Sequence, residues 1–263
     1  MLNKGLGIIF LVLLIAGPGY SQSVDTVLII SVDALHPDAL SKKTSPAIFR
    51  LMKDGRYTLK GTSVDPPKTL IAHTSMMTGL PPAESGKTDN EWKPGDKRVG
   101  KETLFDDAKR AGFHTAFFFS KTKLGYLVNG AVDEHALAPD DGIGRTGVVI
   151  ERQGKKFVFL HISGLEYEGM DNGWLSKSYR EELSSIDGRL APLFADVKKR
   201  SGYLIIVTSD HGGHDRLHGT NHPDDYKLPF IIVSDRITYP DIQDKPYSVT
   251  QLKTILKTVE NGK

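Results

Sequence analysis

The sequence predicts an α/β fold in which helices cover both faces of a mostly parallel sheet, and three observations support this. Several short runs are apolar throughout rather than alternating, which is typical of strands buried on both faces. Helical patterns separate these runs along the chain, and no repeat, low-complexity tract or long linker interrupts it, so a single domain is expected. The predicted strands are Val27–Val32, Thr115–Phe119, Lys156–Ile162, Tyr203–Thr208 and Pro229–Ser234.

The predicted helices are bounded by residues that favour helix caps. The segments Ser45–Gly55 and Thr103–Gly112 each pair a hydroxyl N-cap with a glycine at the far end. A longer segment, Lys177–Arg200, carries apolar residues at helical spacing, and Val249–Val259 closes the chain. These four segments are expected to pack on the sheet.

The composition excludes several classes of chemistry. The 263 residues include 34 Lys and Arg, 32 Asp and Glu and no Cys, which gives a formal charge of +2. Without Cys the chain has no thiolate zinc site, no disulfide, no Cys nucleophile and no Cys-derived nucleophile of the sulfatase type. The nearly balanced charge gives no reason to expect nucleic acid as a partner.

The N-terminus has the pattern of a secretory signal peptide. An apolar run, Leu6–Ala16, follows Lys4, and the small residues Gly19 and Ser21 stand at the cleavage-specifying positions. The run is shorter than the roughly 20 residues that a spanning helix needs, although an uncleaved membrane anchor is the alternative. We therefore expect a signal peptide over residues 1–21, a mature domain over 22–263, secreted or periplasmic location and no stable membrane span after cleavage.

Side chains that bind metals follow three of the predicted strands. Asp33 follows the first, Glu166 follows the strand that contains His161, and Asp210 and His211 follow the Tyr203–Thr208 strand. In an open parallel sheet, ligands bind outside the carboxyl ends of the strands. Gathered carboxylates repel one another unless a cation lies between them, so this edge of the sheet predicts a metal site.

Histidines are concentrated in one loop. Four of the nine, His211, His214, His218 and His222, lie in a twelve-residue stretch rich in Gly and Asp. Carboxylates and imidazoles without thiolates suit Zn²⁺ first, with Mn²⁺ or Fe as possible substitutes. Not all four can be ligands, and a solvated or supporting role is the alternative for each, particularly for His222.

A proline turn, Asp65–Lys68, leads into a short helical stretch that begins near Thr69. A hydroxyl at a helix N-terminus lies beside unpaired N–H groups that suit an anionic substrate. Next to a divalent metal its proton is also easier to remove. Thr69 is therefore a candidate nucleophile, and a plain N-cap role is the alternative.

On these residues the chain resembles the alkaline phosphatase superfamily, in particular its type I phosphodiesterase/nucleotide pyrophosphatase-like branch. The matching motifs are the strand that ends at Asp33, KTLIAHTSMMTGLPP around Thr69, DNEW at 89–92, SDHGGH at 209–214 and HGTNHPDDYKLPFII from His218. The resemblance covers most of the mature chain. It implies an alkaline phosphatase-like sandwich and two metal ions that flank a Ser or Thr nucleophile.

The resemblance also implies roles for single residues. By motif position, one metal site comprises Asp33, Thr69, Asp210 and His211, the second comprises Glu166, residue 170 and His218, and Asn90 binds a phosphoryl oxygen. The chain departs from the family pattern at the second site, where Met170 stands at the position of an expected His ligand. A thioether is a poor ligand for Zn²⁺. Asp171 or His214 completing the site, and a weak or missing second ion, are the alternatives.

The predicted function is a secreted, metal-dependent phosphoric ester hydrolase that acts on small monoesters or diesters. Thr69 attacks phosphorus to give a phosphothreonine, and a water on the second metal releases the phosphate. The alternative, motivated by Met170, is a degenerate relative that binds phosphate or metal without turnover. A third possibility is a phosphonate or sulfate ester hydrolase, although the absence of Cys argues against the usual sulfatase nucleophile.

The sequence leaves little material for a cap over the site. Residues 93–148 contain a predicted strand and helix of the core plus loops, so we expect a minimal cap and an open site that tolerates varied leaving groups. The cationic side chains of Lys68, Lys121 and Lys123 are within the region that can meet a phosphate. We interpret each of them as a solvated or packing lysine.

Overall fold

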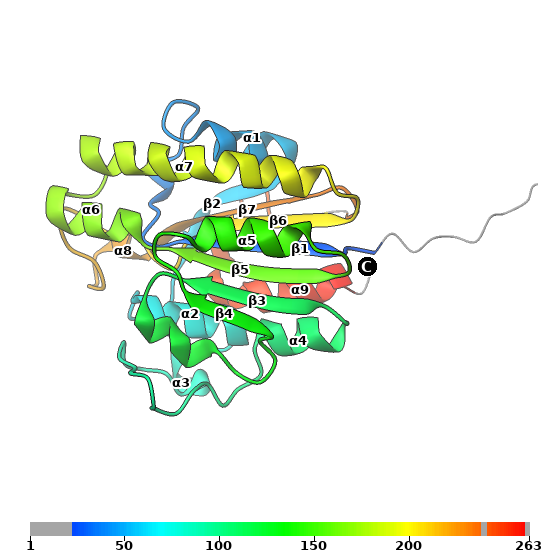
Figure 1. The fold of residues 1–263 in the computed structure, drawn as a ribbon. Helices are drawn as coiled ribbons and strands as arrows, with labels where there is room; N and C mark the ends of the chain where they lie inside the picture. Colours follow the sequence, from blue (N-terminus) through cyan, green and yellow to red (C-terminus); the bar gives the residue numbers. More distant parts are fainter. Residues whose placement is uncertain (1–22, 238–240, 261–263) are drawn as a thin grey trace, which may run out of the picture.

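The computed structural model describes residues 23–237 and 241–260, in which eight strands form one sheet between two layers of helices (Figure 1). The expected signal peptide, residues 1–21, lies outside the described residues. The strands are β1 (Thr26–Val32), β2 (Arg56–Thr62), β3 (His114–Phe119), β4 (Glu134–Leu137), β5 (Lys156–Ile162), β6 (Tyr203–Thr208), β7 (Lys227–Ser234) and β8 (Tyr247–Ser248).

The sheet is mostly parallel, as predicted. Its strand order is β4-β3-β5-β1-β6-β7-β2-β8, and β4, β3, β5, β1 and β6 all pair in parallel. Strand β7 is antiparallel to both of its neighbours, β6 and β2. Because β1 lies between β5 and β6, the carboxyl ends of these three strands meet at one edge of the sheet.

Helices cover both faces of the sheet (Figure 1). One face carries α1 (Pro46–Asp54), α5 (Gly142–Glu151), α6 (Gly164–Asn172) and α7 (Lys177–Lys198), and the other carries α2 (Thr69–Thr78), α3 (Pro82–Ser85), α4 (Leu104–Arg110) and α9 (Leu252–Glu260). The short helix α8 (Pro223–Tyr226) precedes β7, and 3-10 turns span Pro37–Ala39, Thr122–Leu127 and Val249–Gln251.

Strand β1 shows why the predicted strands are apolar throughout. Val27 and Ile29 pack into the core on the side of α2, α4 and α9. Leu28, Ile30 and Val32 pack into the core on the side of α1, α5 and α7. Successive side chains of a strand point to opposite faces, so a strand with helices on both sides needs apolar residues at every position.

The five predicted strands and four predicted helices are present, with ends that shift by at most three residues. The last helix differs, because its first turn, Val249–Gln251, is a separate 3-10 turn before α9. The sequence did not reveal β2, β4 or β8, which lie at or next to the sheet edges and are short or partly exposed. Residues 93–148 supply α4, β3, β4 and most of α5, so this stretch belongs to the core as expected.

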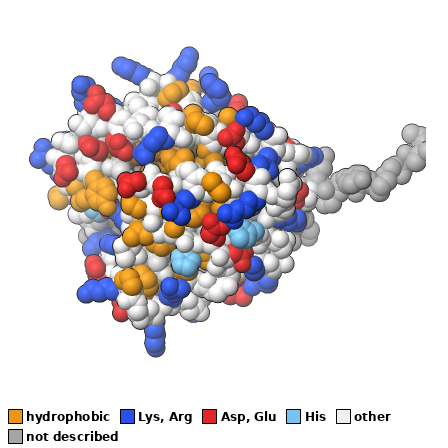
Figure 2. Space-filling model, viewed as in Figure 1, with side chains coloured by type: hydrophobic (Ala, Val, Ile, Leu, Met, Phe, Trp, Pro, Cys, Tyr) orange, Lys and Arg blue, Asp and Glu red, His pale blue; other side chains and the backbone are white. Residues whose placement is uncertain are grey.

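The surface is mixed in charge. On the face drawn in Figure 2, acidic and basic side chains are interspersed, in keeping with the nearly balanced composition. Within residues 23–237 and 241–260, no helix combines the length and the apolar character needed to cross a membrane.

Candidate active site

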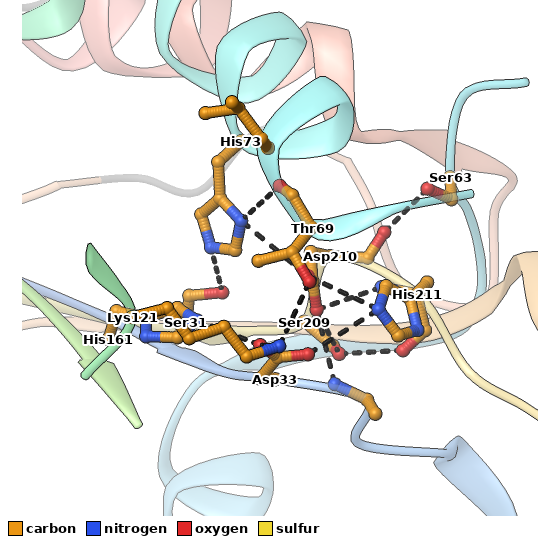
Figure 3. Close-up of polar contacts among 12 residues, drawn as sticks. Ser31, Asp33, Ser63, Thr69, His73, Lys121, His161, Ser209, Asp210 and His211 are labelled. Atoms are coloured by element: carbon orange, nitrogen blue, oxygen red, sulfur yellow. Dashed lines mark hydrogen bonds and ion pairs between the residues drawn. The ribbon is translucent and has the colours of Figure 1, made fainter. Parts of the chain in front are cut away.

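Predicted metal-binding residues converge at the carboxyl edge of β1, β5 and β6, and Figure 3 shows Asp33, Asp210 and His211 side by side there. Asp33 directly follows β1, and Asp210 and His211 come two and three residues after the last residue of β6. Glu166 lies in the first turn of α6, which follows β5. The side chains of Asp33, Asp210 and His211 are fully buried and that of Glu166 is nearly so, so the topology gathers these groups in one buried cluster.

Backbone hydrogen bonds hold the loops of this site against each other. Ala34, which has a positive φ of 61°, donates its N–H to Oδ1 of Asp210 at 3.1 Å. The next N–H, that of Leu35, donates to Oγ of Ser209 at 2.9 Å. The hydroxyl of Tyr179, on α7, donates to the Ala34 carbonyl at 2.6 Å. The loop after β1 is thereby fixed to the loop after β6.

Three buried ligand atoms point at one another and fit a single divalent cation. Oδ1 of Asp33, Oδ2 of Asp210 and Nε2 of His211 have no hydrogen-bond partner within the part of the chain that the structure describes. Nε2 of His211 lies 3.4 Å from the Asp33 oxygen and 3.5 Å from the Asp210 oxygen. Buried polar atoms without partners are costly, and a metal ion between them satisfies all three.

The tautomer of His211 supports this fit. Its Nδ1 lies 2.8 Å from the carbonyl oxygen of Gly212, so this nitrogen carries the proton and donates it. Nε2 then presents its lone pair to the two carboxylates, which is the orientation that a metal-binding imidazole needs.

Thr69 is the first residue of α2, and its side chain is buried. The helix follows Lys68, whose extended backbone ends the proline turn. Oγ1 of Thr69 accepts a hydrogen bond from Nζ of Lys121 at 3.0 Å. The predicted nucleophile therefore lies at a helix N-terminus, where unpaired N–H groups favour an anion.

Asn90 lies beside the same helix N-terminus. Its side-chain Oδ1 accepts the N–H of Leu70, the second residue of α2, at 2.8 Å. Because the carbonyl oxygen is used by the helix, the amide Nδ2 is the group left to donate to a substrate oxygen. The structure thus places Asn90 next to Thr69, as its predicted role requires.

Lys121 occupies the centre of the site, and our interpretation of it as a solvated or packing lysine is wrong. Its Nζ lies 2.5 Å from Oδ2 of Asp33 and also forms an ion pair with the carboxylate of Glu166. Only 9% of the side chain is exposed. Burial alone lowers the pKa of Lys121, but Asp33, Glu166 and Asp210 outweigh it and raise that pKa well above its usual value, so the side chain is a cation.

The same contacts keep Asp33 ionised. Burial raises the pKa of this carboxyl, but Lys121 and the imidazoles of His161 and His211 lower it by more. The pKa of Asp33 therefore lies well below its usual range. His161 contributes directly, since its Nε2 lies 3.0 Å from Oδ2 of Asp33. Its other nitrogen lies 2.8 Å from Oγ of Ser120, which fixes the ring.

The second predicted metal group is incomplete. Nε2 of His218 lies 3.2 Å from Oε1 of Glu166, and the His218 ring stacks on that of His211 at 4.8 Å. Met170, on α6, is 37% exposed, and Asp171 after it is exposed as well. Neither of these two side chains is part of the buried cluster.

His214 and His222 form a separate cluster away from the site. Nδ1 of His214 lies 2.7 Å from Oδ1 of Asp225, and the two imidazole rings stack at 3.9 Å. Backbone hydrogen bonds between His214 and Leu217 fold the loop into a tight turn that returns His218 to the site. His214 therefore does not complete the second metal group.

His73 is a functional candidate that sequence reasoning missed. It lies one helical turn after Thr69, and its Nδ1 donates to the Thr69 carbonyl at 2.8 Å. Nε2 accepts from Oγ of Ser31 at 2.9 Å. Burial lowers the pKa of His73 to about 4, so the ring is neutral and holds the first turn of α2 against β1. The sequence signal that could have identified His73 is its i, i+4 spacing from Thr69, which places the two residues on the same face of the helix.

The fold is that of the alkaline phosphatase superfamily: a mostly parallel sheet with carboxylates, imidazoles and a buried Thr at its carboxyl edge. More specifically, the chain belongs to the type I phosphodiesterase/nucleotide pyrophosphatase family, which matches residues 27–226. The resemblance drawn from the sequence motifs is therefore confirmed.

A curated protein is similar to part of the chain. The phosphopentomutase of Alkaliphilus oremlandii is 28% identical over 140 residues, which are 52% of this chain and 34% of that protein. The chain thus spans about a third of that relative's length.

Two solved structures share the fold. Murine ectonucleotide pyrophosphatase/phosphodiesterase 5 has a TM-score of 0.71 at 15% identity, over 90% of this chain and 95% of that one, and is also known as an inactive Thr-to-Ala variant in complex with AMP. The C-terminal periplasmic domain of EptC from Escherichia coli, in complex with Zn, has a TM-score of 0.66 at 13% identity, over 91% of this chain and 83% of that one.

Proposed function

We propose that this chain is a metal-dependent phosphoric ester hydrolase with Thr69 as its nucleophile. One observation carries the proposal: Oγ1 of Thr69 lies at the N-terminus of α2, hydrogen-bonded to a buried ammonium, in the buried cluster that contains three unpartnered ligand atoms. A hydroxyl placed between cations and free N–H groups is suited to attack a phosphoryl group. The inactive Thr-to-Ala variant of the murine relative is consistent with such a role.

Asp33, Asp210 and His211 would hold the divalent ion, with Thr69 as a further ligand. Zn²⁺ suits this set of oxygen and nitrogen donors best, and Mn²⁺ or Fe are substitutes. When bound, such an ion lowers the pKa of an adjacent hydroxyl and neutralises charge on the phosphoryl oxygens. The zinc complex of the EptC domain supports the choice of ion.

The chain's own residues then determine the reaction geometry. Lys121 donates to Oγ1 of Thr69 and stabilises negative charge on that oxygen as it attacks phosphorus. Nδ2 of Asn90 would donate to a phosphoryl oxygen, as would the first N–H groups of α2 other than that of Leu70, which already donates to Asn90. The bond from phosphorus to the leaving oxygen breaks, and water then hydrolyses the phosphothreonine. His73 keeps the first turn of α2 in place through the Thr69 carbonyl.

The substrate we propose is a small phosphate monoester or diester, outside the cell. The AMP complex of the murine relative supports a nucleotide-sized ligand. The expected signal peptide over residues 1–21 supports export, and the EptC neighbour is a periplasmic domain.

The test is hydrolysis by wild type, Thr69→Ala and Thr69→Ser of a chromogenic monoester, a chromogenic diester and an aryl phosphonate. We expect Thr69→Ala to lose at least about a thousandfold in kcat, because no other hydroxyl occupies the same position, and Thr69→Ser to keep part of the activity. Undiminished hydrolysis by Thr69→Ala would overturn the proposal.

A second candidate is a relative that binds metal and phosphate without turnover, and the exposure of Met170 favours it, since the second metal group is incomplete. It predicts that elemental analysis finds a tightly bound ion while none of the three ester classes is hydrolysed. Hydrolysis that depends on Thr69 would exclude it.

A further inference from the structure

We propose that Lys121 serves as the second cation of this site, so that the enzyme works with one divalent ion and one ammonium group instead of two metal ions. This rests on the proposed function, because it assigns the charges around the same nucleophile.

The ammonium of Lys121 contacts Asp33 and Thr69 of the first predicted metal group and Glu166 of the second. Nζ lies 2.5 Å from Oδ2 of Asp33 and donates to Oγ1 of Thr69 at 3.0 Å (Figure 3). It also forms an ion pair with Glu166. It therefore joins both carboxylates to the nucleophile. An ammonium has three donors, and these contacts use all of them.

The two groups of potential ligand atoms differ in whether their atoms already have hydrogen-bond or ion-pair partners. In the first group, Oδ1 of Asp33, Oδ2 of Asp210 and Nε2 of His211 lack partners in the described part of the chain. In the second group, one Glu166 oxygen contacts Lys121 and the other lies 3.2 Å from His218. Buried polar atoms without a partner need a ligand, whereas atoms that already have a partner do not. We therefore infer one metal ion, bound by the first group of atoms.

The side chains around the second group give the same result. Met170 offers a thioether and is 37% exposed, Asp171 is exposed, and His214 contacts Asp225. Only Glu166 and His218 remain, since His211 already belongs to the first group. A zinc site takes at least three protein ligands, which these two residues do not supply.

Charge balance also favours one ion. By formal charge, the three carboxylates of Asp33, Glu166 and Asp210 and the single ammonium of Lys121 give the buried cluster a charge of −2, imidazoles not counted. One divalent cation neutralises it. A second divalent cation in contact with the same oxygens as Lys121 would be repelled by the ammonium at short range.

Removing the ammonium should open the second group to a metal. In Lys121→Ala, an oxygen of Glu166 loses its partner and Oδ2 of Asp33 keeps only His161, and with His218 these two oxygens form a set of three donors. The exposed Lys101 provides a matched control, because Lys101→Ala removes the same group from the surface.

The experiment is a count of zinc ions per chain by elemental analysis, after equilibration with excess zinc and removal of the unbound metal. We expect one ion in wild type and in Lys101→Ala, and two in Lys121→Ala. Two tightly bound ions in wild type would overturn the inference, and so would a single ion in Lys121→Ala. Circular dichroism of each variant establishes that it is folded before the ions are counted.

The count does not depend on hydrolysis, so it separates the two proposals. If Thr69→Ala were fully active while the counts were one and two as expected, the assignment of the nucleophile would fail and the role of Lys121 as a cation would stand. If wild type held two ions while hydrolysis depended on Thr69, the opposite would be true.

Discussion

Asn90 offers a test of how the transition state is stabilised, because its two side-chain polar atoms have separate roles. Oδ1 accepts the Leu70 N–H at 2.8 Å, and Nδ2 is assigned to a phosphoryl oxygen. Asn90→Asp keeps an acceptor for Leu70 but replaces the donor by an oxygen that carries negative charge. Asn90→Ala removes both groups.

The expected magnitudes follow from these contacts. Loss of one donor to transition-state charge typically lowers kcat about 10² to 10³-fold, or about 2.7–4 kcal/mol. We expect Asn90→Asp at the upper end of that range, since its carboxylate also repels the phosphoryl oxygens. Its stability should stay close to wild type, whereas Asn90→Ala should lose about 1 kcal/mol because the helix N-terminus loses an acceptor.

The assay combines steady-state kinetics on a chromogenic ester with urea unfolding of the same preparations. The metal content of each variant is measured alongside, so that an altered metal site is not mistaken for a lost donor. If Asn90→Asp keeps kcat within tenfold of wild type with unchanged metal content, the role of Asn90 as a donor is refuted.

Two further predictions concern stability. Asp187, in α7, accepts hydrogen bonds from the N–H groups of Ala47 and Ile48 at 2.9 and 2.8 Å. In urea titrations, Asp187→Ala should therefore lower the free energy of unfolding by about 2–4 kcal/mol, and Asp187→Asn by less. Equal stability of Asp187→Ala and wild type would contradict this. His73 has a pKa of about 4 when folded against 6.5 ordinarily, so its contribution is present above pH 6.5 and lost as pH falls toward 4, because the unfolded chain binds the proton first. Relative to His73→Gln, metal-free wild type should lose about 3 kcal/mol over that range, and parallel stability curves would disprove the assignment.

The sequence predicts those site residues that directly follow buried strands. Asp33, Asp210 and His211 directly follow buried strands, and parallel strands bring their carboxyl ends together whatever the details of packing. Thr69 could be predicted at a helix N-terminus because a proline turn precedes it in the sequence. The core strands were equally clear, since burial on both faces demands apolar residues at each position.

The remainder depends on contacts that no local pattern encodes. Lys121 also follows a strand end, that of β3, but a lysine in a sequence is ordinarily solvated. Only its contacts with Asp33, Glu166 and Thr69, from three separate segments, show that it is buried. The sequence of the histidine-rich loop does not show which of His214 and His218 lies in the site. Their positions depend on the turn between His214 and Leu217, which forms only in the folded chain. The strands β2, β4 and β8 were not predicted for a related reason, since strands at or next to the edge of a sheet need only partial burial.

The most direct test of the central claim, that Thr69 is the nucleophile, is to trap the covalent intermediate. Wild type is mixed with excess of the ester that it hydrolyses, quenched in acid within one turnover and digested, and its peptides are analysed by mass spectrometry. We predict a phosphoryl group on Thr69, at a level that rises and falls with turnover, and none in Thr69→Ala. Turnover without any modification, or with the phosphoryl group on another residue, would contradict the account.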